Sequence, residues 1–342
     1  MFRSFCIVLV LLLFSACVKD KPVAITPDPA PQSQLKKVYV INEGGFGYGN
    51  SSISLFDPGT NSVVEDLFKT QNNANLGDVT QSLNYVNGTF YAVVNNSGRI
   101  MVCDAQFKKT GQINGLLSPR YFLPITNQKA YVSDFKANAI SVIDLGSNTK
   151  TKSINCSGWT EGMVLIYNKV FVCNLRRNYV YVINTLNDQI NDSVLVGPNA
   201  SGLVIDKRDK IWVLSSGDAV NSVGARLTRI DPLTNIIEKS FDFSVGESPD
   251  HICLNKTKDS LFYLNKGICL MGIGDAALPS ATFIPGNARN YYGLGINPND
   301  YSIYASDALD YSQKSNIYIF DMKGNQKQVF KAGINANGFY FE

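Results

Sequence analysis

The residues closest to a catalytic or metal-binding pattern in this sequence are one histidine beside an aspartate and one pair of nearby aspartates. His251 follows Asp250, a pair that can act as acid and base, but no serine or cysteine nucleophile stands with it in a recognisable motif. Asp307 and Asp310 suit calcium, yet their stretch lacks the spacing and terminal acid of an EF-hand. The sequence therefore predicts no catalytic residue, no metal site and no cofactor, and it favours a protein that is not an enzyme.

Amide, carboxylate and aromatic side chains recur at loop positions that a repeating strand pattern would bring to one face. Amides and carboxylates hydrogen-bond a polar ligand, and aromatic rings stack on a flat apolar one. Asn and Asp also favour turns whether or not a ligand binds, so this alternative stays open for each of them. The residues predicted to bind a ligand are Asn42, Asp78, Asn95, Asn96, Arg120, Asp134, Trp159, Asn174, Asn265, Tyr291, Tyr292, Asp307 and Tyr311. Loop positions of the same kind hold Glu43, Gln81, Tyr121, Glu161, Asp250 and His251.

A strand pattern that repeats seven times between residues 35 and 342 must position these loops. An apolar strand with an aromatic residue at its second position is followed by a polar turn and a second apolar strand. The seven aromatics are 40 to 52 residues apart, close to the length of a four-stranded propeller blade. No helical period of useful length interrupts the units, so we predict an all-β, seven-bladed β-propeller. The aromatics are Tyr39, Tyr91, Tyr131, Phe171, Trp212, Phe262 and Tyr304.

The two ends of the repeat region predict how the propeller closes. The C-terminal GINANGFYFE resembles VGPNASGLVID, which precedes the first apolar strand of another unit, whereas the region begins directly with VYVIN. The C-terminal strand is therefore predicted to be the innermost strand of the first blade, a pairing that removes two open sheet edges. A further group of residues ends the second apolar strand, where a carboxylate or amide can close a turn on backbone N–H groups. These are Asp57, Asp104, Asp144, Asn184, Asp231 and Asp321.

The first 34 residues predict a signal peptide, a lipid anchor and a tether. Residues 1–16 hold one cation and then an apolar run too short to span a bilayer comfortably. The ending Phe14-Ser15-Ala16-Cys17 resembles a bacterial lipobox, which implies cleavage before Cys17 and acylation of its thiol. An ordinary signal peptide with a nearby cysteine is the alternative. Residues 17–34 are rich in proline and are expected to form a solvated spacer, which leaves residues 35–342 for the propeller.

Charge and cysteine content exclude other classes of protein. The chain has 342 residues, a formal net charge of +3 and one histidine, so neither nucleic-acid binding nor a histidine-rich zinc site is expected. Cys6 lies in the signal peptide and Cys17 is the predicted anchor, which leaves five cysteines without a C-x-x-C motif. Cys103 and Cys173 lie inside apolar strands and are predicted to be buried.

Two sets of stretches resemble known families. The repeat YVSDFKANAISVIDLGSNTKTKSI resembles the YVTN repeats of YncE-like propellers. INEGGFGYGNSSISLFDP, LGDVTQSL, NNSGRIMVCD and YASDALDY are similar to surface lipoproteins of Bacteroidetes, a group that includes the BtuG-type proteins. BtuG-type proteins capture cobalamin and pass it to a TonB-dependent transporter.

The resemblance implies a lipid-anchored protein of the outer membrane, displayed at the cell surface, that captures a small nutrient. Cobalamin is the best single candidate for that nutrient, and a TonB-dependent outer-membrane transporter is the implied partner. Two alternatives from other classes remain open. One is a surface-layer scaffold that binds protein or glycan, and the other is a propeller lactonase or lyase.

Overall fold

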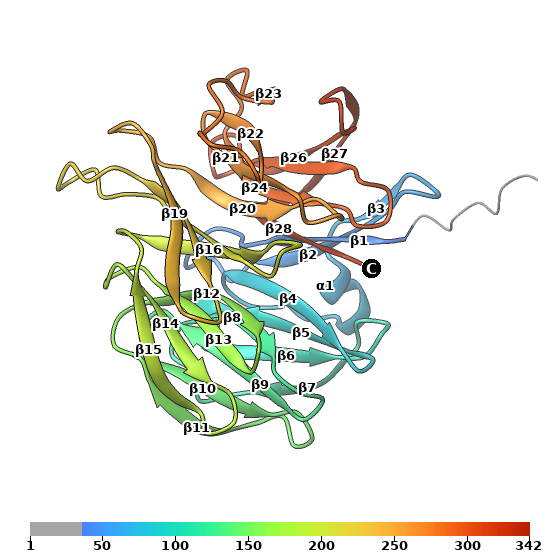
Figure 1. Cartoon of the computed structure of the whole chain (residues 1–342). Coiled ribbons are helices and arrows are strands. Elements are labelled where there is room, and N and C mark those ends of the chain that lie inside the picture. Colours follow the sequence, from blue (N-terminus) through green and yellow to red (C-terminus); the bar gives the residue numbers. More distant parts are fainter. Residues whose placement is uncertain (1–35) are drawn as a thin grey trace, which may run out of the picture. The chain divides into compact units, whose positions relative to one another are not determined.

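The structure, a computed structural model, describes residues 36–342 and confirms the predicted propeller. The predicted signal peptide, Cys17 and the tether lie outside the described residues. Within the described range, strands β1 to β28 form seven sheets of four antiparallel strands each, the blades (Figure 1). A six-residue helix, α1 (Leu67–Asn72), and a 3₁₀ turn, η1 (Asn95–Ser97), interrupt the strands. None of the helices in residues 36–342 is both long and apolar enough to cross a bilayer.

Each blade contributes one strand to each of four concentric positions. The inner strands are β28 (Ala336–Phe341), β4 (Thr80–Val86), β8 (Pro119–Pro124), β12 (Thr160–Ile166), β16 (Ala200–Ile205), β20 (Asp250–Leu254) and β24 (Tyr291–Ile296). The second strands are β1 (Val38–Asn42), β5 (Thr89–Val94), β9 (Lys129–Asp134), β13 (Lys169–Asn174), β17 (Ile211–Ser215), β21 (Ser260–Leu264) and β25 (Ile303–Asp307).

The two remaining positions carry the strands farther from the centre. The third strands are β2 (Ser52–Asp57), β6 (Arg99–Cys103), β10 (Ala139–Asp144), β14 (Tyr179–Asn184), β18 (Arg226–Asp231), β22 (Gly267–Gly272) and β26 (Lys314–Phe320). The outer strands are β3 (Ser62–Val64), β7 (Lys109–Ile113), β11 (Thr149–Asn155), β15 (Gln189–Leu195), β19 (Ile236–Asp242), β23 (Ile284–Pro285) and β27 (Gln326–Ile334).

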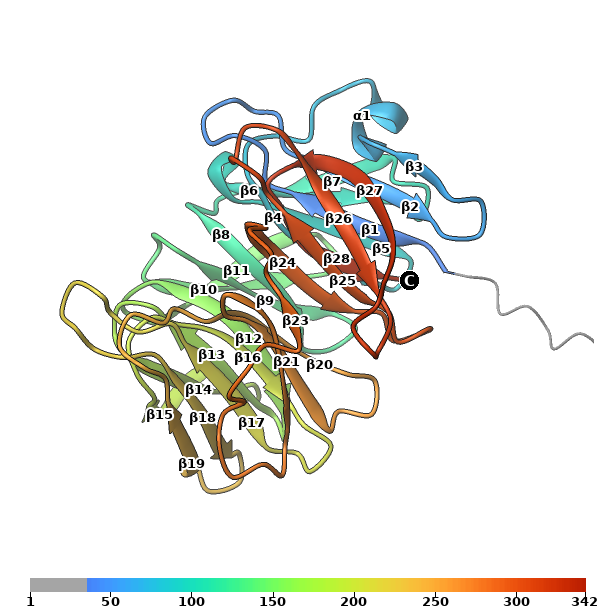
Figure 2. The same ribbon diagram turned by 90° about the horizontal axis from the view of Figure 1, so that it is seen from above.

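The C-terminal strand closes the ring, as predicted. β28 pairs with β1 in the first blade, and both views show the red C-terminal strand beside the blue β1 (Figures 1 and 2). Around the centre, β28 contacts β4, β4 contacts β8, and each following inner strand contacts the next until β24 contacts β28. Each inner strand is still the edge strand of its own sheet, and the adjacent inner strands of the ring protect that edge.

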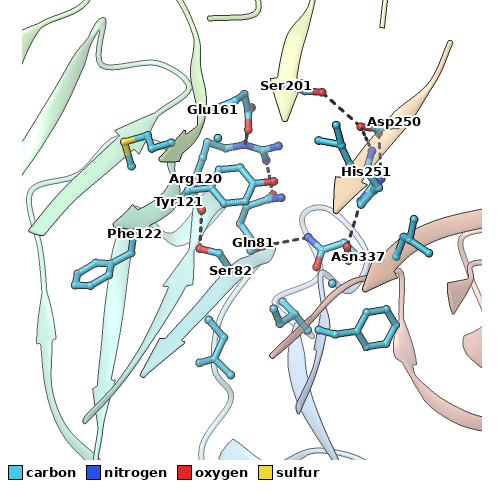
Figure 3. A pocket seen from close by; sticks show the side chains of 18 of the residues that line it. Gln81, Ser82, Arg120, Tyr121, Phe122, Glu161, Ser201, Asp250, His251 and Asn337 are labelled. Atoms are coloured by element: carbon cyan, nitrogen blue, oxygen red, sulfur yellow. Dashed lines mark hydrogen bonds and ion pairs between the residues drawn. The ribbon is translucent and has the colours of Figure 1, made fainter. Parts of the chain in front are cut away.

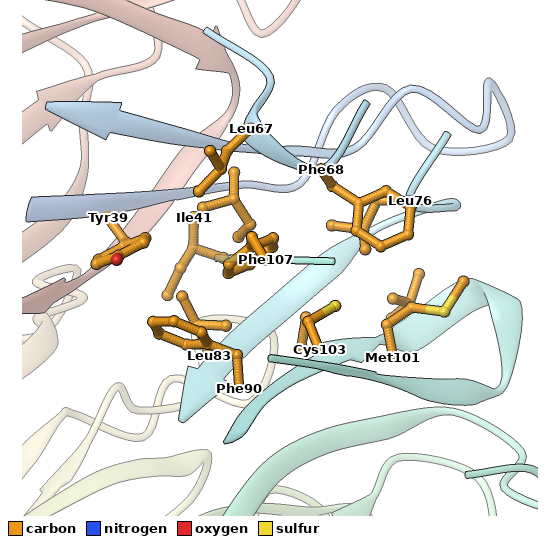
Figure 4. Close-up of a cluster of buried hydrophobic side chains, with 13 residues drawn as sticks. Tyr39, Ile41, Leu67, Phe68, Leu76, Leu83, Phe90, Met101, Cys103 and Phe107 are labelled. Carbon is orange, nitrogen blue, oxygen red and sulfur yellow. The ribbon is translucent and has the colours of Figure 1, made fainter. Parts of the chain in front are cut away.

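The core lies between neighbouring blades and fixes their spacing. The second strands are apolar on both faces, and every residue of β1, β17 and β25 is buried. Between the first two blades, Tyr39, Phe90 and Phe107 pack together with Ile41 and Leu83, as Figure 4 shows. The predictions that Cys103 and Cys173 are buried are confirmed. Both are free thiols, as are Cys156, Cys253 and Cys269.

The predicted turn-closing residues occur at the ends of the third strands. Each accepts a hydrogen bond from a backbone N–H group two or three residues later, with Asp57 bonded to Gly59 at 2.9 Å and Asp144 bonded to Ser147 at 2.7 Å. Asp104, Asn184, Asp231 and Asp321 each bond the N–H group two residues later. These polar side chains are therefore explained by the turns and need no ligand.

Candidate functional site

A β-bulge near the start of every inner strand directs one side chain toward the centre of the ring. In each pair of an inner strand and its second strand, one extra residue stands on the inner strand, for example between Thr80 and Ser82 or between Ala200 and Gly202. The same slip occurs in β8, β12, β20, β24 and β28. Because a bulge re-aims a side chain, seven bulges build a site from seven separate blades.

The second residue of each inner strand lines a central cavity of about 530 Å³. We call these seven residues the polar ring, since all of them carry hydrogen-bonding groups. They are Gln81, Arg120, Glu161, Ser201, His251, Tyr292 and Asn337. Glu43, Tyr121 and Asp250 line the same cavity and add two carboxylates and a phenol.

An apolar layer lies beside the polar ring in the same cavity. One or two residues after the bulge, each inner strand contributes an apolar side chain, and we call these the apolar ring. They are Leu83, Phe122, Met163, Leu203, Ile252, Leu294 and Phe339. Between the two layers, Gly162 and Gly293 let adjacent inner strands approach, because a Cβ atom at either would lie 2.8 Å from a neighbouring strand's backbone.

Arg120 ties three blades together inside the polar ring. Its Nε lies 2.8 Å and 3.0 Å from the two carboxylate oxygens of Glu161, and its Nη1 donates to the Gln81 side chain, as Figure 3 shows. The Glu161 side chain is only 3% exposed, whereas that of Arg120 is 22% exposed. Burial raises the pKa of Glu161, although the Arg120 guanidinium opposes this rise. The Arg120 Nε–H group is thus shared between the two oxygens of a buried carboxylate, and this ion pair orients Arg120 in the cavity.

His251 and Asp250 form an ion pair at the start of β20, in the sixth blade. His251 Nδ1 faces Asp250 Oδ2 at 3.3 Å, and His251 Nε2 lies 3.2 Å from the carbonyl oxygen of Asn337. Burial alone would lower the pKa of His251, but the Asp250 carboxylate, the Asn337 carbonyl and Glu43 together outweigh burial and raise this pKa. The reverse holds for Asp250, whose pKa burial would raise and the imidazole lowers. Both ring nitrogens thus lie near oxygen acceptors, which favours the protonated form of the imidazole.

Glu43 is linked to the polar ring by hydrogen bonds from neutral donors. Its two carboxylate oxygens accept hydrogen bonds from the Tyr292 hydroxyl at 2.6 Å and from Asn337 Nδ2 at 2.8 Å. Asn337 Nδ2 also donates to the backbone carbonyl of Gln81 at 3.2 Å. Burial raises the pKa of Tyr292, and Glu43 raises it further. The network thereby joins the first, second, sixth and seventh blades.

A second pocket, which we call the tyrosine groove, adjoins the cavity and has a volume of about 490 Å³. It shares Asp250, His251 and Tyr292 with the central cavity. The rings of Tyr292 and Tyr311 meet edge to face, with 5.6 Å between their centroids. Half of Tyr311 is exposed. The groove therefore offers aromatic surface to a ligand that also reaches the polar ring.

The structure brings five of the predicted ligand-binding residues together at these two pockets. Arg120 and Tyr292 line the central cavity, and Asn265, Tyr291, Tyr292 and Tyr311 line the tyrosine groove. The Asn265 side chain donates to Glu247, and the Tyr291 hydroxyl accepts a hydrogen bond from Arg289 at 3.0 Å.

Five predicted residues are instead buried and hydrogen-bonded to backbone groups of their own or a neighbouring blade. Asp134 is fully buried and accepts hydrogen bonds from four backbone N–H groups, including those of Leu117 and Ala137. Asn42, Asn95, Asn174 and Asp307 are also buried and bonded to backbone groups. Asn42 accepts from the N–H group of Gly333 in the seventh blade, and Asn95 donates to the carbonyl of Pro119 in the third. The contacts of these five residues therefore match the alternative that Asn and Asp stabilise loops and turns without a ligand.

Three predicted residues lie apart from the two pockets. Asn96 donates to Asp78 at 2.6 Å, and Asp78 also accepts from the N–H group of Gly47. Trp159 stacks on Phe135 with 4.1 Å between ring centroids, and the Arg176 guanidinium lies 3.7 Å from the centroid of the Trp159 ring. The Trp159 ring is thus in contact with side chains of neighbouring loops.

Most of the polar ring was not among the residues predicted from the sequence. Gln81, Glu161 and His251 stand at loop positions that the sequence analysis identified, but Ser201 and Asn337 do not. A short pattern in the sequence marks five of the polar-ring residues: a polar residue precedes a small residue and an apolar one in QSL, EGM, SGL, YGL and NGF. This pattern can be recognised only after the sequences of the inner strands are aligned with one another.

Several solved structures share this fold at low sequence identity. A protein from Lactobacillus plantarum has a TM-score of 0.68 and 13% identity, with 90% of this chain and 99% of that chain covered. A Pseudomonas aeruginosa periplasmic gluconolactonase has a TM-score of 0.67 and 12% identity, with 89% and 99% covered. A Bacteroides fragilis protein named as a candidate 6-phosphogluconolactonase has a TM-score of 0.67 and 10% identity, with 92% and 100% covered. These likenesses show the fold alone.

Sequence comparison identifies the family. No protein with a curated description is similar to the chain in sequence. The model of a family described as a domain of unknown function, DUF5074, matches residues 36–342. This match spans the whole propeller, with its bulged inner strands and both pockets, and the chain therefore belongs to the DUF5074 family.

Proposed function

We propose that the propeller captures a small polar ligand at the polar ring and the tyrosine groove, and that it does so without transforming it. The observation that carries this proposal is the bulge on every inner strand, since seven separate blades each direct one polar side chain into one cavity. A concave site with a few convergent polar groups beside apolar and aromatic surface is typical of ligand binding.

The engagement of His251 supports binding over catalysis. A general base needs a free ring nitrogen within reach of the proton it removes. In this site Nε2 lies 3.2 Å from the Asn337 carbonyl oxygen, which can only accept, and Nδ1 faces the Asp250 carboxylate at 3.3 Å, so both ring nitrogens are directed at acceptors of the protein itself. The lactonase or lyase alternative would therefore have to find its base elsewhere in the cavity.

Cobalamin is the ligand we propose to test first. The reason is the resemblance of the repeats to BtuG-type lipoproteins, together with a groove that offers Tyr311 and Tyr292 to a flat apolar face. The amide groups at the edge of a corrin ring would require donors and acceptors, which the polar ring supplies. The polar ring residues with amide side chains are Gln81 and Asn337.

We further propose that Cys17 carries a lipid anchor, that the protein stands on the outer membrane at the cell surface, and that a TonB-dependent transporter is its partner.

Exposed apolar side chains between β1 and β2 support a protein-binding role for this loop. Phe46 is 74% exposed and Tyr48 is 81% exposed. A scaffold function without a small ligand would use the same side chains, and it is the second candidate.

Calorimetry of the full chain with cyanocobalamin, haem and an oligosaccharide separates these functions. Capture of cobalamin predicts heat with cyanocobalamin and a single site. Heat with haem or the oligosaccharide alone would retain ligand capture and reject cobalamin. Silence from all three at micromolar protein would overturn the proposal and favour the scaffold.

A matched pair of tyrosine variants locates the binding site. Tyr311 and Tyr167 are 50% and 48% exposed, and both have positive φ angles, 63° and 51°. Asn tolerates that backbone conformation, so Tyr311→Asn and Tyr167→Asn remove an exposed ring at equal backbone cost. Tyr311→Asn is expected to weaken binding at least tenfold, because an aromatic anchor contributes about 2 kcal/mol. Tyr167→Asn, on the hairpin between β12 and β13, is expected to leave the affinity unchanged.

A further inference from the structure

We infer that the ligand of the polar ring carries a positive charge, namely a primary ammonium or guanidinium group, on an apolar body. This inference rests on the proposed ligand capture and names a chemical class of ligand. Cobalamin carries amides and no ammonium or guanidinium group, so the two candidate ligands are tested side by side. It follows from three observations: the charge of the cavity, its unused hydrogen-bond acceptors, and the apolar ring beside them.

The cavity holds more negative than positive charge. Three carboxylates line it, those of Glu43, Glu161 and Asp250, against the two cations Arg120 and His251. Glu161 is paired with Arg120 and Asp250 with His251, so these four charges compensate one another. Glu43 is left, because no Lys or Arg side chain within residues 36–342 forms an ion pair with it. A half-buried carboxylate without a cation attracts one from solution.

The acceptors around Glu43 outnumber the donors available to them. Asn337 is 8% exposed, and within the described chain its Oδ1 atom is buried without a hydrogen-bond donor. Its Nδ2 group is already used, since it donates to Glu43 and to Gln81. An unpaired buried acceptor costs free energy that a donor would recover. An ammonium group brings three donors and no acceptor, and a guanidinium brings five, so both fit this imbalance.

The apolar ring indicates what the cation is attached to. Leu83, Phe122, Leu203 and Leu294 are more than nine-tenths buried and line the same cavity as Glu43. A bare inorganic cation would leave this surface uncovered. An alkyl or aryl amine would cover it while its charged end stays at the polar ring.

The charge of His251 competes with the ligand and predicts a pH dependence. The groups that face His251 are Asp250 on its own strand, Glu43 after β1, the Asn337 carbonyl on β28 and the phenol of Tyr292 on β24, whose ring centroid lies 6.4 Å from that of the imidazole. In the adjoining groove, Lys266 pairs with Glu247 at 3.5 Å, and the Arg289 guanidinium lies 3.9 Å over the ring of Tyr318. Asp250 raises the pKa of His251 above its ordinary value, so the imidazole loses its proton only as the pH rises through that raised pKa. The five charged groups of the cavity then sum to −2 and no longer −1, and a cation is bound more tightly.

Three probes of one size and different charge test the inference by calorimetry on the full chain. They are 2-phenylethylamine, which is a cation at neutral pH, the neutral 2-phenylethanol and the anion phenylacetate. We expect the amine to bind at least tenfold more tightly than the alcohol, and phenylacetate to bind more weakly still. Equal or tighter binding of the alcohol or of phenylacetate would overturn the inference, as would silence from the amine.

Two carboxylate variants assign the charge selectivity to Glu43. Glu43→Gln removes the unpaired charge and keeps the shape, so the amine is expected to bind within about threefold of the alcohol. Glu65→Gln is the matched control, because Glu65 is exposed, pairs with Lys314 and does not line the cavity. Its affinities are expected to equal those of the unchanged chain. Retained selectivity in Glu43→Gln would contradict the inference even if every probe binds.

The pH arm compares pH 6 with pH 9, where the amine is still protonated. Binding of 2-phenylethylamine is expected to tighten several-fold at pH 9, and His251→Asn is expected to abolish that change while the variant stays folded at its positive φ of 53°. The inference and the proposed function fail separately. Cyanocobalamin binding with a silent amine would overturn only the inference, whereas silence from both would overturn both.

Discussion

At the scale of single residues, the cavity depends on Arg120 being held in one position. Arg120 bonds both oxygens of Glu161 on one neighbouring blade and the side chain of Gln81 on the other. Its guanidinium also lies 5.4 Å over the ring of Phe135. Removing one partner leaves a partly buried charge without compensation, which costs more than the pair itself contributes.

Glu161→Gln is therefore expected to lower the free energy of unfolding by about 3 kcal/mol, as measured by urea denaturation. Arg226→Met is the control, since Arg226 and Asp242 form an ion pair that is 42% and 68% exposed. Its loss is expected to cost less than about 1 kcal/mol, because solvent screens an exposed pair. Equal costs for the two variants would show that the Arg120 pair has no special role.

Residue type alone could not separate ligand-facing polar groups from turn-closing ones. Asp134 and Asn174 were predicted to bind a ligand, and Asp144 was predicted to close a turn, yet all three accept bonds from nearby backbone N–H groups. Asn and Asp serve both purposes with the same atoms, and burial decides between them. Arg120 and Tyr292 do line the central cavity, since a long cationic or aromatic side chain beside an inner strand has no turn to close, and their binding of a ligand stays a prediction.

At the scale of elements, the inner strands combine a bulge with close packing. Gly162 follows the bulge of β12, and a Cβ atom there would lie 2.8 Å from the Ser201 carbonyl oxygen on β16. A neighbouring backbone cannot move aside as a flexible side chain can. The glycine thus sets the distance between the fourth and fifth blades, and with it the width of the cavity.

Gly162→Ala is expected to lower the free energy of unfolding by roughly 1 to 3 kcal/mol, the range for overpacking a close contact. Gly274→Ala provides a control, because a Cβ atom at Gly274 has no neighbouring atom within 4 Å and its φ is not positive. The control is expected to leave the thermal unfolding midpoint unchanged. A neutral Gly162→Ala would mean that the inner strands have room to separate.

The order of the strands was predictable from the sequence, whereas the bulges were not. Aromatics at the second position of VYVIN, AYVSD and IYASD identify the second strands, since an apolar strand with this pattern is buried on both faces. The sequences of the inner strands are less regular. GINANGFYFE and VGPNASGLVID, for example, are alike mainly in their length and in the positions of their small residues. A bulge adds one residue to one strand, which a period-two pattern does not register.

At the scale of the whole molecule, the fold depends on β28 joining the two ends of the described chain. β28 pairs with β1 and contacts both β24 and β4, and it also places Asn337 in the polar ring. Without it the first blade would expose the edge of β1, and the apolar ring would lose Phe339.

Deletion of residues 335–342 is expected to lower the thermal unfolding midpoint of the entire domain by at least about 10 °C. Extension of the C-terminus by eight Gly and Ser residues serves as the control and is expected to shift the midpoint by no more than about 1 °C. If the truncated chain unfolded at the temperature of the full one, the closing role of β28 would be wrong.

The proposed anchor makes a prediction about the location of the whole protein. Cys17→Ser removes the thiol that acylation requires, so the protein is expected to move from the membrane fraction to the soluble fraction. Labelling cells with a clickable fatty acid is expected to mark the unchanged chain and not the variant. Label on the Cys17→Ser protein would contradict the anchor.

The central claim is that seven bulged inner strands form one ligand site at one end of the propeller. Amide hydrogen exchange of the full chain, with and without saturating cyanocobalamin or 2-phenylethylamine, measures this segment by segment. The account predicts slower exchange at the starts of the inner strands, in residues 80–83, 120–123, 250–254, 291–294 and 336–339. Ligand-dependent protection confined to the hairpins at residues 166–168 and 185–188, or no protection at the inner strands under saturating binding, would contradict it.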